Sequence, residues 1–119
     1  MTTGFLTTHV LDTALGLPAA GIEIALYRVS GNSHKKIATA VTNADGRTDV
    51  PILPATKFKA GIYELVFFAG DYLRQTGQVS AEPLFLDQIP LRFGINDAES
   101  HYHVPLLLSP FSYSTYRGS

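Results

Sequence analysis

The sequence of 119 residues contains no cysteine and no tryptophan, and it has only one methionine. Without cysteine the chain has no thiolate nucleophile, no zinc finger and no disulfide framework. Its length is that of an ordinary globular domain and suffices to bury a core without cross-links. We therefore expect residues 1–119 to form a single domain.

Charge is also scarce, because 16% of the residues are charged and the formal net charge is -1. The nine basic residues are scattered and offer no continuous positive field to a phosphate backbone. No apolar run approaches the ~20 residues that cross a bilayer. The first residues do not resemble an export signal, and Arg117-Gly118-Ser119 is not a peroxisomal signal. We expect a cytoplasmic protein without a nucleic-acid or membrane partner.

Apolar residues recur with a period of two, and Gly, Pro, Asn and Asp interrupt them, which predicts an all-β fold. The expected strands cover residues 5–13, 22–27, 37–42, 61–70, 91–95, 101–108 and 111–117. The turn Asn43-Ala44-Asp45-Gly46 predicts a hairpin whose second strand ends near Pro51. Residues 71–76, which lack alternation, predict one short helix. About eight strands at these spacings are typical of a two-sheet sandwich.

The segment from residue 101 to 108 sorts its side chains onto two different faces. One face carries Tyr102, Val104, Leu106 and Leu108, whereas the other carries His101, His103, Pro105 and Leu107. A row that mixes histidine with apolar residues suits an interface or pocket better than a dry core or a solvated face. Ser112, Ser114 and Tyr116 share a polar face of the last strand in the same way.

The histidines and one arginine are the residues most able to carry chemistry. His34 lies in a charged turn, where a solvated role is expected. His9 and His103 fit either a partly buried structural histidine or a general base. Arg47 follows the turn and fits either an exposed arginine or a fixed cation with five hydrogen-bond donors.

A metal or an organic cofactor has little support in the sequence. His101 and His103 have the H-x-H spacing of zinc ligands, and His9 would complete a three-histidine site. Only Asp97 and Glu99 lie near enough in sequence to support such ligands, so we expect no metal. Phosphate-loop, dinucleotide and nucleophile-elbow motifs are missing, so we expect no cofactor.

Several separated motifs resemble those of the transthyretin-like proteins, and within them the branch that hydrolyses 5-hydroxyisourate. The resemblance spans nearly the whole chain and rests on Leu6-Thr7-Thr8-His9-Val10-Leu11-Asp12, Thr42-Asn43-Ala44-Asp45-Gly46-Arg47, Gly61-Ile62-Tyr63-Glu64-Leu65 and the block 101–119. The ending Tyr116-Arg117-Gly118-Ser119 is the most specific part, because the hormone-carrier branch lacks it and has other residues at the positions of His9, Arg47 and His103.

The resemblance implies a transthyretin-like sandwich with one short helix, assembled as a homotetramer whose active sites lie in a channel between two dimers. It implies that His9, Arg47 and His103 are catalytic. It also implies substrate contacts from His9 and Arg47 and from a C-terminal set that consists of Ser114, Tyr116, Arg117, Gly118 and Ser119.

The implied reaction is hydrolysis of 5-hydroxyisourate to 2-oxo-4-hydroxy-4-carboxy-5-ureidoimidazoline in urate degradation. A neutral imidazole suits the activation of water near pH 7, and arginine suits a developing negative charge. His103 is the favoured base and His9 the favoured partner, although the sequence leaves these two roles exchangeable. The alternatives are a carrier that binds an aromatic ligand in the same channel, and an interaction module without a pocket.

Overall fold

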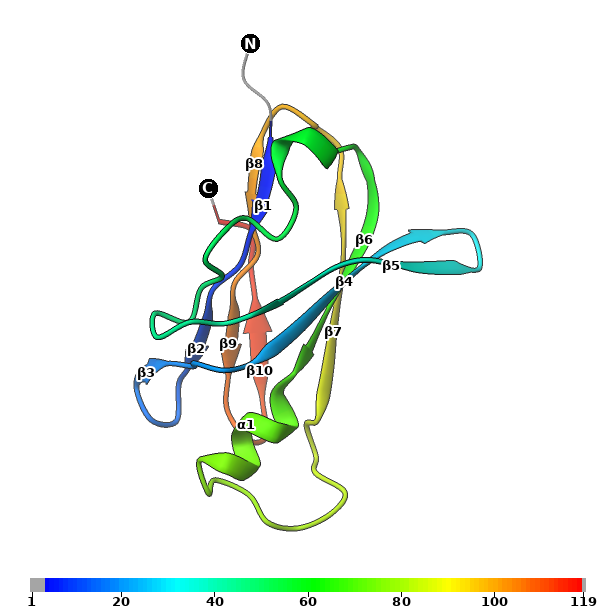
Figure 1. Ribbon diagram of the computed structural model, residues 1–119. Coiled ribbons are helices and arrows are strands. Elements are labelled where there is room, and N and C mark those ends of the chain that lie inside the picture. The colour runs from blue at the N-terminus through cyan, green and yellow to red at the C-terminus, as the bar shows by residue number, and fades with distance from the viewer. Residues whose placement is uncertain (1–3, 119) are drawn as a thin grey trace.

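The computed structural model describes residues 4–118, which form ten strands, one α-helix and one short 3-10 helix (Figure 1). The strands are β1 (Phe5–Thr7), β2 (Val10–Asp12), β3 (Leu17–Pro18), β4 (Glu23–Ser30), β5 (Ser33–Val41), β6 (Gly61–Phe68), β7 (Gln88–Ile95), β8 (His101–His103), β9 (Leu106–Leu108) and β10 (Tyr113–Thr115). The helices are η1 (Ala55–Lys57) and α1 (Ala69–Gln75). The predicted all-β architecture with one short α-helix is confirmed.

The first layer contains the two segments that the sequence singled out, residues 5–12 and 101–108. Strand β1 pairs with β8 in parallel, and β2 pairs with β9 in parallel. The register is the same in both pairs, with Thr7 opposite His103 and Val10 opposite Leu106. The pairs therefore form one layer with a local interruption. Strands β10 and β3 flank the β9-β2 pair, which gives the order β10-β9-β2-β3.

The interruption divides each of two expected strands into two. On one side it falls at Pro105, which has no N–H to give to the ladder. On the other side Thr8 turns its hydroxyl to the main chain and donates a 2.7 Å hydrogen bond to the carbonyl oxygen of Val104. When each broken pair is counted as one long strand, the described residues match the predicted number of about eight.

The second layer is an antiparallel sheet of order β5-β4-β6-β7. Strand β6 lies between β4 and β7, as its run of aromatic and β-branched residues predicts. The core lies between the two layers and includes the fully buried Leu6, Leu26 and Leu65. The row of Tyr102, Val104, Leu106 and Leu108 faces this core and is buried. The opposite row, with both histidines, is therefore available on the other side of the first layer.

The predicted hairpin after residue 46 is wrong. Residues 43–46 do form a turn, with Gly46 at a φ of 76° and its amide donating to the Asn43 carbonyl oxygen at 2.9 Å. The chain then crosses to the other layer, where Arg47 forms an antiparallel bridge with His9. Residues 47–51 form no strand, because their partner is this distant segment and not the strand that precedes the turn.

Helix α1 is tied to the first layer by a buried carboxylate. Asp12 is 1% exposed and accepts a 2.6 Å hydrogen bond from the Tyr72 hydroxyl and a 2.8 Å bond from Nε2 of Gln78. Burial acts to raise the pKa of Asp12, but these bonds and those from two backbone amides outweigh burial and lower it. Burial, together with the hydrogen bond to Asp12, raises the pKa of the Tyr72 hydroxyl. The charged carboxylate is therefore the form that the fold stabilises.

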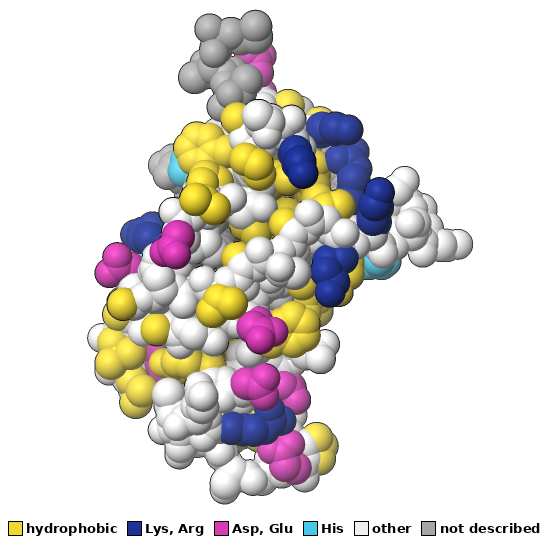
Figure 2. Space-filling model, viewed as in Figure 1, with side chains coloured by type: hydrophobic (Ala, Val, Ile, Leu, Met, Phe, Trp, Pro, Cys, Tyr) yellow, Lys and Arg dark blue, Asp and Glu magenta, His cyan; other side chains and the backbone are white. Residues whose placement is uncertain are grey.

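The charged side chains are unevenly distributed over the surface. On the face in Figure 2, acidic groups gather around α1, and Lys and Arg gather toward the opposite end of the molecule. The acidic end includes an ion-pair cluster in which Arg74 contacts Asp71, Glu82 and Asp87. Within the described residues, no helix is long and apolar enough to cross a membrane.

Candidate active site

The turn of residues 43–46 brings His9 and Arg47 together. The amide of Val10 donates to the carbonyl oxygen of Gly46 at 2.7 Å, next to the bridge between His9 and Arg47. Nε2 of His9 lies 2.8 Å from the carbonyl oxygen of Asp45. A carbonyl oxygen only accepts, so this ring nitrogen carries the proton and neutral His9 keeps a lone pair on Nδ1.

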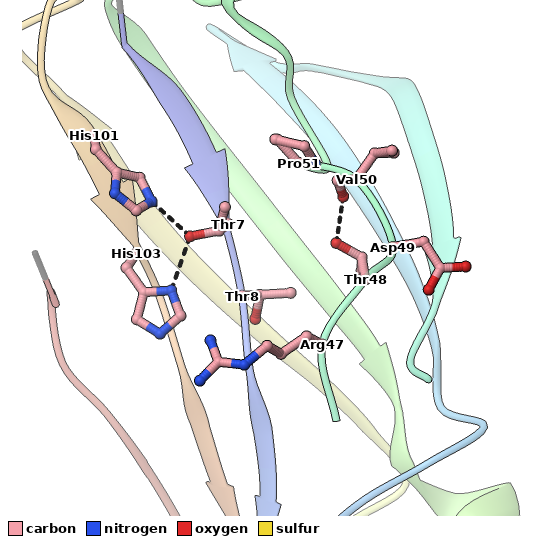
Figure 3. Close-up of a pocket in the computed structure, with 9 residues that line it drawn as sticks. All are labelled: Thr7, Thr8, Arg47, Thr48, Asp49, Val50, Pro51, His101 and His103. Carbon is pink, nitrogen blue, oxygen red and sulfur yellow. Dashed lines mark hydrogen bonds between the residues drawn. The ribbon is translucent and has the colours of Figure 1, made fainter. Parts of the chain in front are cut away.

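His101 and His103 lie two residues apart on β8 and so point to the same side of the layer, and the parallel pairing of β1 with β8 places Thr7 beside them. The hydroxyl oxygen of Thr7 lies between them, 2.7 Å from Nε2 of His101 and 2.8 Å from Nδ1 of His103 (Figure 3). The ring of His101 also stacks on Phe5, with ring centroids 4.2 Å apart. Two strands and one hydroxyl thus fix the position of His103.

A hollow of about 400 Å³ lies beside this group. Thr7, His101 and His103 line one side of it, and residues 47–51 line the other. The Arg47 side chain extends toward the ring of His103 (Figure 3). Burial and the nearby charges of Arg47, His101 and His9 lower the pKa of His103. His103 is therefore held in its neutral form, with Nδ1 engaged by Thr7.

The C-terminal segment lies against the other side of His103. The amide of Gly118 donates to the carbonyl oxygen of His103 at 2.7 Å. The guanidinium of Arg117 lies 3.9 Å from the ring centroid of Tyr102, and this contact anchors the segment. Tyr116, Arg117 and Gly118 join both histidines around a second hollow, of about 840 Å³.

The sequence-based site residues thus fall into three groups. Arg47 forms the bridge with His9 and extends toward His103, although His9 lines neither hollow. Tyr116, Arg117 and Gly118 lie beside His103. Ser114 lies on exposed strand β10 and lines neither hollow, while Ser119 falls outside the residues that the structure describes. His34 lies on β5 in the other layer, where its Nε2 is 2.9 Å from a guanidinium nitrogen of Arg92.

Two residues of the site were missed by sequence reasoning. Thr7 was noted only as part of a motif, and His101 only for its face and as a possible zinc ligand. Thr7 contacts His103 directly, and His101 contacts Thr7. The alternation of residues 5–12 and 101–108 carried a signal, since Thr7 shares a face with His9 and His101 shares one with His103. What sequence alone did not supply was the pairing of two segments more than ninety residues apart.

Among residues 4–118 no group of three or more His, Cys, Asp or Glu side chains is arranged to hold a metal ion. His101 and His103 are oriented by the Thr7 hydroxyl that lies between them. Their chemistry in this geometry is that of hydrogen-bonded imidazoles beside a guanidinium, which suits proton transfer to and from a polar substrate.

The structure is a two-layer β-sandwich with one short helix, and this arrangement defines a transthyretin-like fold. Histidines and an arginine lie together on its outer face and can carry out acid–base chemistry. Residues 6–118 match the HIUase/Transthyretin family, and the chain belongs to this family. The chain is 61% identical over 116 residues to "5-hydroxyisourate hydrolase 2" of Rhizobium meliloti, with 98% of this chain and 97% of that protein covered.

Solved structures agree with the family. The structure of Klebsiella pneumoniae 5-hydroxyisourate hydrolase matches with a TM-score of 0.78 and 35% identity over 100% of both chains. The crystal structure of (S)-allantoin synthase matches with a TM-score of 0.92 and 48% identity over 99% of this chain, which spans 44% of that longer chain. Sea bream transthyretin in complex with thyroxine matches with a TM-score of 0.83 but 29% identity, covering 95% of this chain and 93% of its own. The predicted transthyretin-like fold is confirmed.

Proposed function

We propose that this chain hydrolyses 5-hydroxyisourate to 2-oxo-4-hydroxy-4-carboxy-5-ureidoimidazoline, a step of urate degradation, and that residues 1–119 carry the activity as one domain. The meeting of His9, Arg47 and His103 is the observation that carries the proposal. The relatives with much higher identity than transthyretin are named as hydrolases, which supports an enzyme over a carrier of an aromatic ligand.

Water activation falls to His103. Its pKa is held below the usual range, first by burial and then by the charge of Arg47, so the ring is neutral at pH 7 and able to accept a proton. Among the described residues its Nε2 has no hydrogen-bond partner, whereas Nδ1 is engaged by Thr7. Water gives its proton to Nε2, and the oxygen forms a bond to the attacked ring carbonyl carbon.

Charge stabilisation falls to Arg47. The attacked carbonyl oxygen becomes an anion, and a permanently charged guanidinium facing His103 offers it several N–H donors. The tetrahedral intermediate then collapses as the C–N bond of the ring breaks. The proton taken by His103 passes to the departing nitrogen, so the base is restored and no covalent enzyme intermediate is needed.

The hydrogen bond of His9 indicates its role. Nε2–H is already given to the Asp45 carbonyl, so neutral His9 presents only the lone pair of Nδ1 to a ligand. A lone pair accepts from a ring N–H of the substrate. These contacts favour His9 as the residue that orients the substrate and His103 as the base, and we assign the two roles in this way.

The remaining contacts come from the C-terminal segment. Tyr116 is 57% exposed and lines the second hollow, where its hydroxyl is available to a flat polar ring. Arg117 lies over Tyr102 and acts by anchoring the segment in addition to any contact with substrate. Gly118 supplies backbone groups beside His103, and Ser119 and Ser114 complete the proposed set.

The proposed homotetramer, a dimer of dimers, is supported by the sheet edges. Strands β7 and β10 are the edge strands of their sheets on one flank of the sandwich, and edge strands invite pairing with another copy. An apolar hollow of about 370 Å³, lined by Leu91, Phe93 and Tyr113 among others, lies between these strands. A mass measurement by light scattering tests the assembly, and cell fractionation tests the proposed cytoplasmic location.

The decisive functional test generates 5-hydroxyisourate in situ from urate and urate oxidase and follows its ultraviolet decay. Spontaneous decay is the blank. A hydrolase accelerates the decay catalytically, at protein concentrations far below that of the substrate, and the acceleration persists in a chelator because the mechanism uses only the chain's own groups. A carrier leaves the decay unchanged, or slows it in proportion to the protein added.

A further inference from the structure

The hydroxyl of Thr7 makes two short contacts with two different imidazoles. It lies 2.7 Å from Nε2 of His101 and 2.8 Å from Nδ1 of His103. A hydroxyl has one proton and two lone pairs, and among the described residues the two imidazoles are the only hydrogen-bond partners of the Thr7 hydroxyl. Its proton therefore goes to one ring, and it accepts from the other. The protonation of one ring nitrogen therefore dictates the protonation of the other.

Two arrangements of the protons satisfy both contacts when the imidazoles are neutral. In the first, Thr7 donates to His101, and Nδ1–H of His103 donates to Thr7, which leaves the lone pair of His103 on Nε2. In the second, His101 donates to Thr7, and Thr7 donates to Nδ1 of His103, which puts the proton on Nε2. Only the first arrangement lets His103 accept a proton from water through Nε2.

The surroundings of His103 favour the first arrangement. Its Nε2 is on the side of the ring that faces the guanidinium of Arg47 (Figure 3). The groups near the ring that carry or can gain a positive charge are Arg47 from the loop, which is always charged, and the imidazoles of His101 from β8 and His9 from the first layer. A guanidinium only donates, so it stabilises a facing lone pair and disfavours a facing N–H.

We propose that Thr7 is a positioning residue that sets the tautomer of His103, and that His101 acts through Thr7 by accepting its hydroxyl proton. The proposal rests on the proposed hydrolase function for its catalytic consequence, although the tautomer itself is a property of the free protein. His101 is fixed for this task by stacking on Phe5, 4.2 Å between centroids and 16° between planes. His101, Thr7 and His103 thus form a hydrogen-bonded chain in which the position of one proton determines the position of the next.

The same hydrogen-bonded chain allows the positive charge to move from His103 to His101. After His103 has taken a proton from water, its Nδ1–H can pass to the Thr7 oxygen while the Thr7 hydroxyl proton passes to Nε2 of His101. Two O–H or N–H bonds break and two form, so no proton is lost. The positive charge then rests on His101, one ring further from Arg47. The reverse of these two transfers returns it to His103, which then gives Nε2–H to the departing nitrogen and is left neutral with its lone pair on Nε2.

Two substitutions test the assignment by different routes. Thr7→Val keeps the shape of the side chain but removes the hydroxyl, which frees the tautomer of His103. His101→Phe keeps an aromatic ring for stacking on Phe5 but removes the acceptor, so the Thr7 hydroxyl turns to Nδ1 of His103 and the tautomer reverses. Thr7→Ser retains the hydroxyl and is the conservative rescue.

The matched controls make the same chemical changes elsewhere. Thr13→Val removes a hydroxyl that donates a 3.0 Å bond to the Leu108 carbonyl oxygen, away from both hollows. His34→Phe makes the histidine exchange on the other layer. The stability of these two control variants shows how much each type of substitution disturbs the fold by itself.

The readouts are 15N NMR of the histidine rings, which separates a bare ring nitrogen from an N–H, and steady-state kinetics with 5-hydroxyisourate. We expect Thr7→Val and His101→Phe each to lower kcat by about 10- to 100-fold, as loss of a supporting partner of a working histidine does. KM is expected to stay near wild type, and Thr7→Ser to restore kcat. The double variant should be no worse than Thr7→Val, because His101 acts only through Thr7.

The proposal is overturned if His101→Phe leaves both the His103 tautomer and kcat unchanged, since a stacking role alone predicts that result. It is also overturned if wild-type His103 carries its proton on Nε2. If wild-type protein does not accelerate substrate decay, the proposed function fails, and the NMR comparison of wild type with His101→Phe still decides the tautomer assignment.

Discussion

The amide nitrogen of Gly118 lies 2.7 Å from the carbonyl oxygen of His103, and this hydrogen bond holds the C-terminal segment against the imidazole proposed as the base. The approach is close, because a Cβ added at Gly118 would lie 2.8 Å from Cδ2 of His103 and 3.3 Å from its Cβ. Glycine is thus required at this position for packing, even though its backbone has no positive φ.

Gly118→Ala is therefore expected to displace the His103 ring and to lower kcat, by up to about 100-fold for a displacement near 1 Å. Global stability should change little, since Gly118 lies at the end of the described chain and outside the core. Steady-state kinetics and thermal unfolding check both parts. Wild-type kcat in this variant would show that the segment does not position His103.

The charge of Arg47 is expected to control the titration of His103. After burial, Arg47 is the next cause of the lowered pKa of His103. Removing this charge in Arg47→Gln raises the pKa of His103. The His103 ring is then protonated at pH values where the wild-type ring is still neutral. The acid limb of any residual activity shifts to higher pH with it, since a protonated ring is no base.

NMR titration of the His103 ring in wild type and Arg47→Gln measures this shift without relying on activity. Arg92→Gln is the matched control, because Arg92 contacts His34 in the other layer and should leave the titration of His103 unchanged. A His103 titration that is identical in wild type and Arg47→Gln would contradict the proposed arrangement.

Asp12 is expected to make stability depend on pH. Burial raises its pKa, but the hydrogen bonds from Tyr72, Gln78 and two amides outweigh burial and lower it. A carboxyl whose folded pKa lies below its unfolded value adds stability at pH values above the unfolded pKa. This contribution is lost as pH falls through the folded pKa.

Asp12→Asn should lower the free energy of unfolding at pH 7 by about 1–3 kcal/mol, because it removes a charged acceptor and leaves a buried amide poorly matched to its donors. It should also flatten the dependence of stability on acid pH. Urea unfolding between neutral and acid pH measures both effects, with exposed Glu99→Gln as the control. Equal pH dependence in Asp12→Asn and wild type would remove Asp12 from this role.

Local patterns predicted the elements of this fold better than their pairing. The period-two pattern identified the strands, and the run of residues 71–76 without this alternation marked helix α1, which spans Ala69–Gln75. The turn ending at Gly46 was also found. Its predicted second strand was wrong, because the preferred partner of Arg47 is His9, 38 residues earlier in the chain, and no local pattern records such a contact.

The candidate site, like the fold, was predicted in its residue types but not in its long-range contacts. The residue types of His9, Arg47 and His103 indicated the chemistry, and the resemblance to a family selected them from other histidines and arginines. The supporting contacts of Thr7 and His101 depend on the register of two parallel strands, with Thr7 opposite His103. Register is set by packing of the buried faces over the whole layer, so the sequence of either strand alone does not contain it.

The most direct test of the account is the turnover of 5-hydroxyisourate by wild type, His103→Asn and Arg47→Ala, compared with His34→Asn. All four proteins must have the same assembled mass. Their unfolding midpoints must differ by no more than those of variants with substitutions at exposed positions. His103→Asn should lower kcat by about 10²- to 10⁴-fold, as loss of a general base does. Arg47→Ala should lower it by about 10²- to 10³-fold, as loss of an oxyanion donor does. His34→Asn should match wild type. Wild-type turnover in His103→Asn would contradict the central claim that the imidazole held between Thr7 and Gly118 activates the water.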